Sequence, residues 1–593
     1  MKNKIYILTL VIVTFSGCIK DTLNQKPTLS FFEENSFETF DLTKIYAFGL
    51  YNAFEGYALG PINTEFNGDL VMRNSTETGS AWLWNRVEIP VTSSIWNFEN
   101  NRRINIMLKN IETSKMTAEE INHWKSIGYF FRAYDYYAKI SAYGDIPWID
   151  KVVTDSADDP LLYAERTPRD VVADNMLNDL LFAEANIFEP GTHGLPANYV
   201  GANAVRALIS RFGLFEGTWR KYHGLTDAQK YLKASADASK KLIDENIGLH
   251  PNYDEVFNSE SLEGVKGIIL YKDYRHTVLT HILTSRHKNS AGNWDMTKAG
   301  ADLYLLKDGM TRWKSPLFST DKNAYDEFRN RDRRMLYTIV PPYRVKKVSG
   351  NPKTFTHTAN AADREYIDLV ATFSDPTHKE LPSRNWAGNV SPVSPHFRDF
   401  NEGSGFNVSR TGYFIFKYYN RFHDIQNSDF SDAPIFRMGE VLVNYAEAKF
   451  ELGEFDQTIA DITINKLRAR GEVAHLEIAS IDADFDPTRD PGVDPILWEI
   501  RRERAIELMF EGFRFDDLRR WKKMDYAAKE KLGRWVDPAK LGNAIKTQNG
   551  EAPGYIVKFG TPPPFPEHYY LYPVPSNEIV LNPKIAPNPG WEQ

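Results

Sequence analysis

Three glutamates at helical spacing form the densest acidic group in the sequence. Glu503, Glu507 and Glu511 lie within WEIRRERAIELMFEGFRFDDLRRW (498–521), and their i, i+4 spacing predicts one shared helix face. Such carboxylates could bind a metal, but di-iron bundles add Glu-x-x-His partners, and no histidine occurs between positions 476 and 567. Six arginines are interleaved with the acids, and arginine pairs with carboxylates in a two-pronged geometry. We therefore interpret the segment as an ion-pair network.

The familiar signatures of catalysis are missing from the sequence. It contains no G-x-S-x-G elbow, no H-E-x-x-H and no P-loop or dinucleotide fingerprint, and the glycines at 403 and 405 form only a lone G-x-G. A pair of acids for glycoside hydrolysis stays open, because such carboxylates need only be close in space. A structural calcium site is also open, although no EF-hand spacing occurs. We predict a protein that is not an enzyme, with no cofactor and no metal site.

Tryptophans in irregular segments give a more specific signal for ligand binding. Trp82 and Trp84 alternate in a stretch that also holds Arg73 and Asn85, and Trp294 lies in a second irregular region. An aromatic ring offers a flat apolar surface to a sugar, while Arg and Asn side chains bind hydroxyl groups, a mixture that is typical of ligand sites. We predict these five residues as ligand contacts. The alternative is that the tryptophans only pin loops to the helices.

The N-terminus carries a targeting signal. Two lysines precede an apolar stretch at 5–15, which suits a secretory signal but is shorter than the ~20 residues that span a bilayer. Small residues then precede Cys18, the single cysteine of the chain, and this ending resembles a bacterial lipobox. We predict a signal peptide at 1–17, lipidation at Cys18 and a lipidated tether at 18–35. An ordinary secretory signal or a short helix of the fold is the alternative.

The composition narrows the possible partners. One cysteine excludes a disulfide framework within the chain and cysteine-based metal sites. A formal net charge of −8 over 593 residues argues against a basic nucleic-acid surface. The only membrane contact that we expect is through the lipid.

These candidate residues need a scaffold, and most of it is predicted to be helical. Apolar residues recur at helical spacing over 37–55, 95–111, 117–143, 167–187, 198 or 203 to 222, and 227–246. Thr117 and Glu120 predict a capping box, and Trp96 and Trp124 are predicted core residues. Long helices joined by short polar turns suggest helix pairs that resemble tetratricopeptide repeats.

The second half is predicted to be more irregular. Residues 250–430 are rich in Gly, Pro, Asn, Ser and Asp, with short strand-like runs at 267–271, 336–340 and 413–418. Helices return at 434–452, 458–470 and 494–521, and the proline-rich residues 555–593 predict an extended strap over the core. The prediction is one mainly α body of helix pairs with a loop-rich, short-strand second half.

Several long motifs, in a fixed order, resemble those of the SusD/RagB family of outer-membrane lipoproteins of the Bacteroidota. Segment 498–521 resembles the family's acidic–arginine helix followed by E-G-x-R and D-L-x-R-W. Further matches are RMGEVLVNYAEAKFELG (437–453), NKLRARGEV (465–473) and LYPVPSNEIVLNPKIAPNPGW (571–591). Others are FFRAYDYYAKISAYGDIPWI (130–149), KDGM (307–310) and NRDRRM (330–335). The resemblance covers nearly the whole mature chain.

The resemblance implies about four tetratricopeptide-like helix pairs. It divides the chain into a SusD-like helical repeat region at 36–250 and a C-terminal SusD/RagB region at 251–593, packed as one compact body. Within the second region, it places loops at 251–430, helices at 434–521 and the strap at 555–593. Sugar contacts in the family correspond to residues 56–93 and roughly 271–320 here, and no individual contact residue carries over.

The resemblance also implies a role. Family members are surface-exposed lipoproteins of the outer membrane that capture an oligosaccharide and deliver it to a SusC-like TonB-dependent transporter. Some relatives handle peptides instead, so the same role for peptides stays open. A glycoside hydrolase and a scaffold that binds only proteins are the remaining alternatives.

Overall fold

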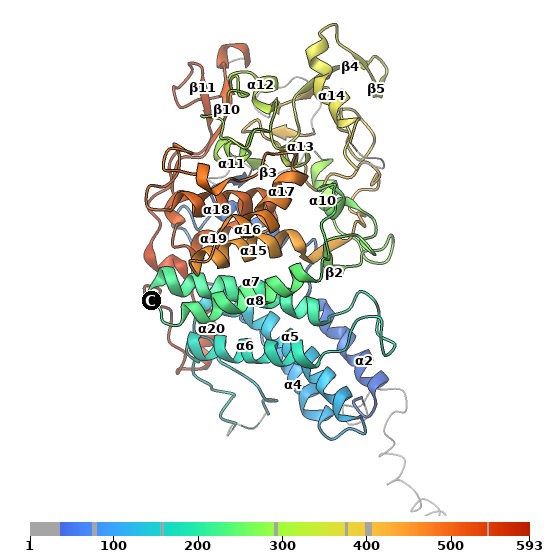
Figure 1. Ribbon diagram of the computed structural model, residues 1–593, viewed down its shortest axis with the longest axis vertical. Helices are drawn as coiled ribbons and strands as arrows, with labels where there is room; N and C mark the ends of the chain where they lie inside the picture. The colour runs from blue at the N-terminus through green and yellow to red at the C-terminus, as the bar shows by residue number, and fades with distance from the viewer. Residues whose placement is uncertain are drawn as a thin grey trace, which may run out of the picture.

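A computed structural model describes residues 36–73, 80–154, 156, 159–289, 294–373, 378–397, 406–541 and 545–592. Helices fill the lower and middle parts of the molecule, and loops with short strands fill the upper part (Figure 1). This arrangement confirms the predicted mainly helical fold with a loop-rich second half. The signal peptide, Cys18 and the tether lie outside the described residues, as does the G-x-G at 403–405.

Most of the helices before position 250 pack on a helix that is close in sequence. These helices are α2 (Phe40–Phe48), α3 (Leu59–Asn63), α4 (Glu99–Ile111), α5 (Ala118–Tyr143), α6 (Arg169–Asn186), α7 (Ala202–His223) and α8 (Ala228–Asp244). The predicted capping box is present, because Thr117 and Glu120 each accept the other's backbone N–H. Helices α7 and α8 approach closely at Gly213, where an added Cβ would lie 2.7 Å from the Tyr231 carbonyl oxygen.

A second helical block continues the first one. It contains α15 (Met438–Glu451), α16 (Gln457–Ile462), α17 (Ile464–Arg470), α18 (Pro495–Glu507) and α19 (Arg514–Arg520). Helix α15 packs on α7 and α8, and α18 packs on α15. The loop-rich middle, residues 251–430, is therefore inserted between α8 and its packing partner α15.

The helix predicted over 494–521 is interrupted. Helix α18 ends at Glu507 and α19 begins at Arg514, with a turn between them. Phe510 and Gly512 adopt positive φ values of 62° and 89° in this turn. A Cβ at Gly512 would lie 2.8 Å from the Pro61 carbonyl oxygen, so this close approach requires glycine.

The ion-pair network predicted for this segment is confirmed. Glu507 is fully buried, and guanidinium groups of three arginines surround it: Arg334, Arg437 and Arg470. Glu511 lies beyond the helix end, yet it still binds Arg437 at 2.7 Å. A fully buried carboxylate needs such partners, because an unpaired charge in the interior is costly.

The loop-rich middle contains short elements. Its helices are α9 (Glu255–Asn258), α10 (Leu283–His287), α11 (Lys298–Leu303), α12 (Ala324–Phe328), α13 (Arg333–Thr338) and α14 (Glu365–Val370). Its strands are β2 (Ile268–Lys272), β3 (Trp294–Met296), β4 (Tyr343–Val348), β5 (Asn351–His357), β6 (Val393–Ser394), β7 (His396–Phe397) and β8 (Val408–Ser409). Four more strands lie outside it: β1 (Val71–Arg73) before it, and β9 (Ala433–Arg437), β10 (Leu532–Val536) and β11 (Gly554–Val557) after it.

These strands make small separate sheets. Strand β2 pairs antiparallel with β9, β1 with β3, and β10 with β11, while β4 lies between β5 and β6. Strands β7 and β8 are parallel. The run predicted at 267–271 thus corresponds to β2, and 413–418 makes only isolated bridges through Phe414 and Ile415.

The strand predicted at 336–340 is wrong, because most of this run belongs to helix α13. The Asp332 side chain accepts the Arg334 N–H and caps the helix. An apolar run of this length does not distinguish a strand from a short buried helix by its pattern.

The strap, residues 555–592, returns to the first helices. In Figure 1 the red C-terminal segment runs down to α20 (Ser576–Leu581), close to α6. The Tyr572 N–H donates to the Ala142 carbonyl at 2.8 Å, and Asn588 Nδ2 donates to the Tyr143 carbonyl at 3.1 Å. The strap is therefore not wholly extended, since it contains α20.

The core confirms the predicted placement of two tryptophans. Trp96 and Trp124 are both buried among the N-terminal helices. A second cluster of buried apolar residues fills the loop-rich middle. Within the described ranges, none of the helices combines the length and the apolar character that crossing a membrane demands.

Candidate functional site

The fold brings together two predicted contact residues that are far apart in sequence. Strands β1 and β3 are antiparallel, and Arg73 lies directly opposite Trp294. Arg73 is exposed at the end of β1, and its guanidinium lies 5.0 Å from the centre of the Phe66 ring. This cation–π contact orients a charged donor toward the surface.

Trp294 itself is part of the core. Only 4% of the residue is exposed, and its ring packs against His287 at 5.1 Å and Phe510 at 5.2 Å between centroids. A ring covered in this way offers no face to a ligand. The prediction of Trp294 as a stacking platform is therefore not supported by its position.

Trp82 is half-buried and faces the strap. Its ring lies 4.5 Å from that of Tyr572, and it also packs against Tyr569 and Phe515. These contacts match the alternative interpretation, in which the tryptophan pins its loop to the body. Trp82 therefore positions its neighbours in the loop.

Trp84 and Asn85 follow in the same turn. The Trp84 N–H donates to the Ser80 carbonyl at 3.2 Å, and the Ser80 hydroxyl accepts the Leu83 N–H at 3.3 Å. Trp84 is half-buried, whereas Asn85 is exposed and has a positive φ of 51°. Asn85 Nδ2 donates to the Pro564 carbonyl at 3.2 Å, which ties the turn to the chain beside the strap's tyrosines.

Buried charged side chains anchor the segment that leads into β1. Asp69 accepts two hydrogen bonds from Arg514, at 2.7 and 2.8 Å, and Lys531 donates to the Val71 carbonyl at 2.9 Å. Burial acts to raise the pKa of Asp69, but Arg514 outweighs it and the pKa is lowered. The stretch that leads into β1 is thus anchored to the start of α19.

We use the name loop surface for Arg73, Trp84 and Asn85, the predicted contact residues that are at least partly accessible and are not packed against the strap's tyrosines. They present an exposed cation, part of an aromatic face and an amide, a set that can bind a polar ligand. Trp82 packs on the strap, and Asp69 pairs with Arg514 in the segment before β1. Sequence reasoning chose these residues by their types, and the choice of contacts stays a prediction.

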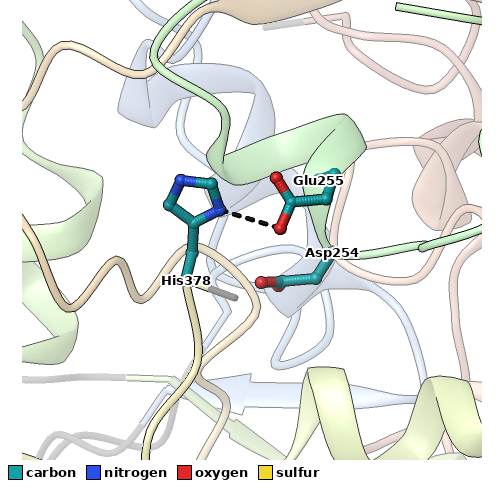
Figure 2. A group of neighbouring side chains, drawn as sticks. All are labelled: Asp254, Glu255 and His378. Atoms are coloured by element: carbon teal, nitrogen blue, oxygen red, sulfur yellow. Dashed lines mark hydrogen bonds and ion pairs between the residues drawn. The ribbon is translucent and has the colours of Figure 1, made fainter. Parts of the chain in front are cut away.

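A second group of polar side chains was missed by the sequence analysis. Asp254 and Glu255, at the start of α9, face His378 from a segment far along the chain (Figure 2). The His378 Nδ1 lies 3.0 Å from Glu255 Oε1, and its Nε2 lies 3.2 Å from Glu260 Oε2. No spacing in the sequence signals this group, because only the tertiary fold joins positions 254 and 378.

The charges in this group are strongly coupled. Burial acts to lower the pKa of His378, but its hydrogen bonds to Glu255 and Glu260 outweigh burial and raise the pKa to about 9. Glu260 responds in the opposite sense: burial acts to raise its pKa, but His378 lowers it to about 2. At neutral pH the imidazolium therefore bridges two carboxylates.

Comparisons with known proteins agree with the fold. A sequence model of the SusD family, SusD_RagB, matches residues 267–591. The SusD-like protein P2 of Formosa agariphila is 23% identical over 478 residues, which covers 80% of this chain and 75% of that protein.

Solved structures match over nearly the whole chain. A SusD-like carbohydrate-binding protein of Bacteroides fragilis has a TM-score of 0.66 at 18% identity, covering 93% of this chain and 100% of that one. A second SusD-like protein of Bacteroides fragilis has a TM-score of 0.65 at 20% identity, covering 94% and 98%. At such identities the likeness establishes the fold.

Proposed function

This chain belongs to the SusD family of outer-membrane-associated, non-catalytic binding proteins, and on that premise we propose that it captures an oligosaccharide at the cell surface and delivers it to a SusC-like TonB-dependent transporter. The observation that carries the proposal is the family match over residues 267–591. The likeness of fold to a protein described as carbohydrate-binding supports the choice of ligand class.

The loop surface is the proposed contact area. The Trp84 ring supplies an apolar face for a sugar, while Arg73 and Asn85 bind hydroxyl or carboxylate groups. Trp82 keeps the turn in place through its contacts with the strap. The predicted contact at Trp294 is left out of the proposed area, because its ring is buried.

The test is a binding screen of the purified protein against soluble polysaccharides and peptides. We expect affinity for one polysaccharide class, with no release of new reducing ends. The variant Trp84→Ala should bind that ligand on the order of 10-fold more weakly, equivalent to ~1.4 kcal/mol. Trp386→Ala is the matched control, because Trp386 is 41% exposed and lies outside the loop surface.

Each other result has a defined meaning. Binding to peptides without binding to any polysaccharide would replace the glycan ligand by a peptide. Equal binding by the Trp84→Ala and Trp386→Ala variants would move the contact area away from the loop surface. Release of reducing ends would contradict a purely binding role.

Attachment and delivery are tested in cells. Acyl chains on Cys18 would hold the protein to the outer membrane, since more than one chain gives stable anchoring. We expect Cys18→Ser to move the protein from the membrane fraction to the soluble one. Isolation of the wild-type, lipidated protein in mild detergent should recover a barrel transporter of the SusC type with it. Isolation without such a transporter would contradict the delivery step.

A further inference from the structure

The group at the start of α9 has the composition of a metal site. Asp254, Glu255 and His378 each direct one potential ligand atom into a common space, and these atoms lie within 4.8 Å of one another (Figure 2). Two carboxylates and an imidazole are ligands that zinc and related divalent ions accept, whereas calcium prefers oxygen alone.

One ligand atom in the group lacks a protein donor. Asp254 is 1% exposed, and its Oδ1 accepts from Lys379 at 3.0 Å and from Asn258 at 2.8 Å. Among the described residues, no hydrogen-bond donor reaches its Oδ2. A buried carboxylate oxygen without a donor is costly, and a cation on the side of Glu255 and His378 would satisfy it.

The surroundings of His378 match those of a metal-binding histidine. Such histidines almost always donate their second ring N–H to a carboxylate or carbonyl, which fixes the ring and its tautomer. Here Nε2 faces Glu260, and Glu260 is itself held by Asn420 Nδ2 at 3.1 Å. Nδ1, on the other side of the ring, faces Glu255 at 3.0 Å. Two atoms bound to one metal at ~2.0–2.1 Å lie about 3.0–3.4 Å apart, so this pair is spaced for metal binding.

The charged groups around the site also favour a cation. Three carboxylates, Asp254, Glu255 and Glu260, lie next to His378 and Lys379, and Lys379 pairs with Asp254.

We infer that Asp254, Glu255 and His378 form a binding site for a zinc-like divalent cation, with Glu260 as the residue that orients His378. The cation is bound by the Nδ1 lone pair, and the proton that leaves Nδ1 goes to solvent. The bound ion ties α9 to the segment at 378–379, whose Lys379 in turn binds the carbonyls of Phe416 and Lys417 at 2.7 Å each.

The experiment titrates ZnCl2 into the full chain, purified in detergent without a histidine tag and treated with a chelator. Calorimetry should give one zinc site per chain. His378→Gln should abolish zinc binding, and Glu260→Gln should weaken it about 10–100-fold. His357→Gln is the matched control, because His357 is exposed in β5 and should leave the affinity unchanged.

The unmodified protein provides a readout that does not depend on variants folding. Zinc should raise its melting temperature, and the chelator should reverse the shift. No zinc binding, or equal affinity in the His378→Gln and His357→Gln variants, would overturn the inference. Binding of calcium in place of zinc would overturn the assigned class of metal.

Discussion

The second helical block and the loop-rich middle both bury many charged side chains, but they use them differently. Around α15, α18 and α19, buried charges bind one another. Arg520 binds Glu447 at 2.6 Å, and Arg504 binds Asp517 at 2.8 Å. The backbone of these helices already has its hydrogen bonds, so the side chains are left to join one helix to the next.

In the loop-rich middle, buried charges also form ion pairs, but several of them bind backbone groups as well. Asp295 accepts the N–H groups of Arg410 and Thr411, at 2.7 and 3.2 Å. Lys379 donates to three carbonyls between residues 416 and 419, and Lys288 donates to the carbonyls of Arg421 and His423 at 3.1 and 2.8 Å.

The difference follows from the hydrogen-bonding needs of a buried backbone. A helix satisfies its own N–H and carbonyl groups, whereas a buried loop must find partners elsewhere. A single carboxylate or ammonium can satisfy two or three such groups. The loop-rich middle can therefore be buried and irregular at once, provided that its charges stay in place.

The largest effect should come from breaking the helical network at its centre. Glu507→Ala leaves three arginines without their buried partner, so we expect a loss of about 5 kcal/mol in the free energy of unfolding, the upper end for a buried pair. Chemical denaturation measures it. Glu507→Gln, which keeps the shape without the charge, should lose nearly as much. A loss below 1 kcal/mol in both variants would show that the network adds little to stability.

The next test uses pH to separate the two regions. Burial raises the pKa of Asp295 to about 7, although the N–H groups of Arg410 and Thr411 act in the opposite direction. The folded chain holds this proton more tightly than the unfolded chain. The contribution of Asp295 to the free energy of unfolding is therefore full below pH ~4 and is lost as pH rises to about 7. At 1.36 kcal/mol for each pKa unit, the change is about 3–4 kcal/mol.

Asp295→Asn isolates this contribution. The free energy of unfolding of this variant, relative to that of the wild-type protein, should rise by about 3–4 kcal/mol between pH 4 and 7. Glu447 of the helical network should behave in the opposite way. Burial acts to raise the pKa of Glu447, but Arg520 outweighs it and lowers the pKa, so its contribution is lost as pH falls. A pH-independent difference for Asp295→Asn would mean that the carboxylate stays ionised in the fold.

The smallest expected effect tests a buried lysine that donates to backbone carbonyls and also pairs with Asp424 at 3.3 Å. Lys288→Met should cost about 1.5–3 kcal/mol, because two buried carbonyls lose a charged donor. Hydrogen exchange should rise mainly in residues 421–424. Lys240→Met, which removes an exposed pair with Asp244, is the control and should cost less than about 1 kcal/mol. Equal hydrogen exchange at residues 421–424 in both variants would contradict a role of Lys288 in holding this backbone.

Local sequence patterns predicted the long helices but missed features that depend on tertiary contacts. The long helices follow from apolar periodicity, and the start of α5 follows from Thr117 and Glu120. The end of α18 was missed, since the turn at 508–513 depends on a close approach between Gly512 and Pro61. The short helix at Arg333–Thr338 was missed because its apolar run also suits a strand.

The candidate site was predictable only in part. Tryptophans in a loop could be found by composition, but their exposure depends on the partners that the fold brings. Tyr569 and Tyr572 cover much of Trp82, and Phe510 packs on Trp294, from positions far along the chain. The group at Asp254, Glu255 and His378 has no local signature, because its spacing exists only in three dimensions.

The contact between Trp82 and the strap sets an order on biosynthesis. Residues near position 80 complete their packing only when Tyr569 and Tyr572 have been made and have returned to them. A chain truncated before position 567 would keep Trp84 and Asn85 but lack both tyrosine rings. Packing around Trp82 is therefore complete only in a chain that includes the strap.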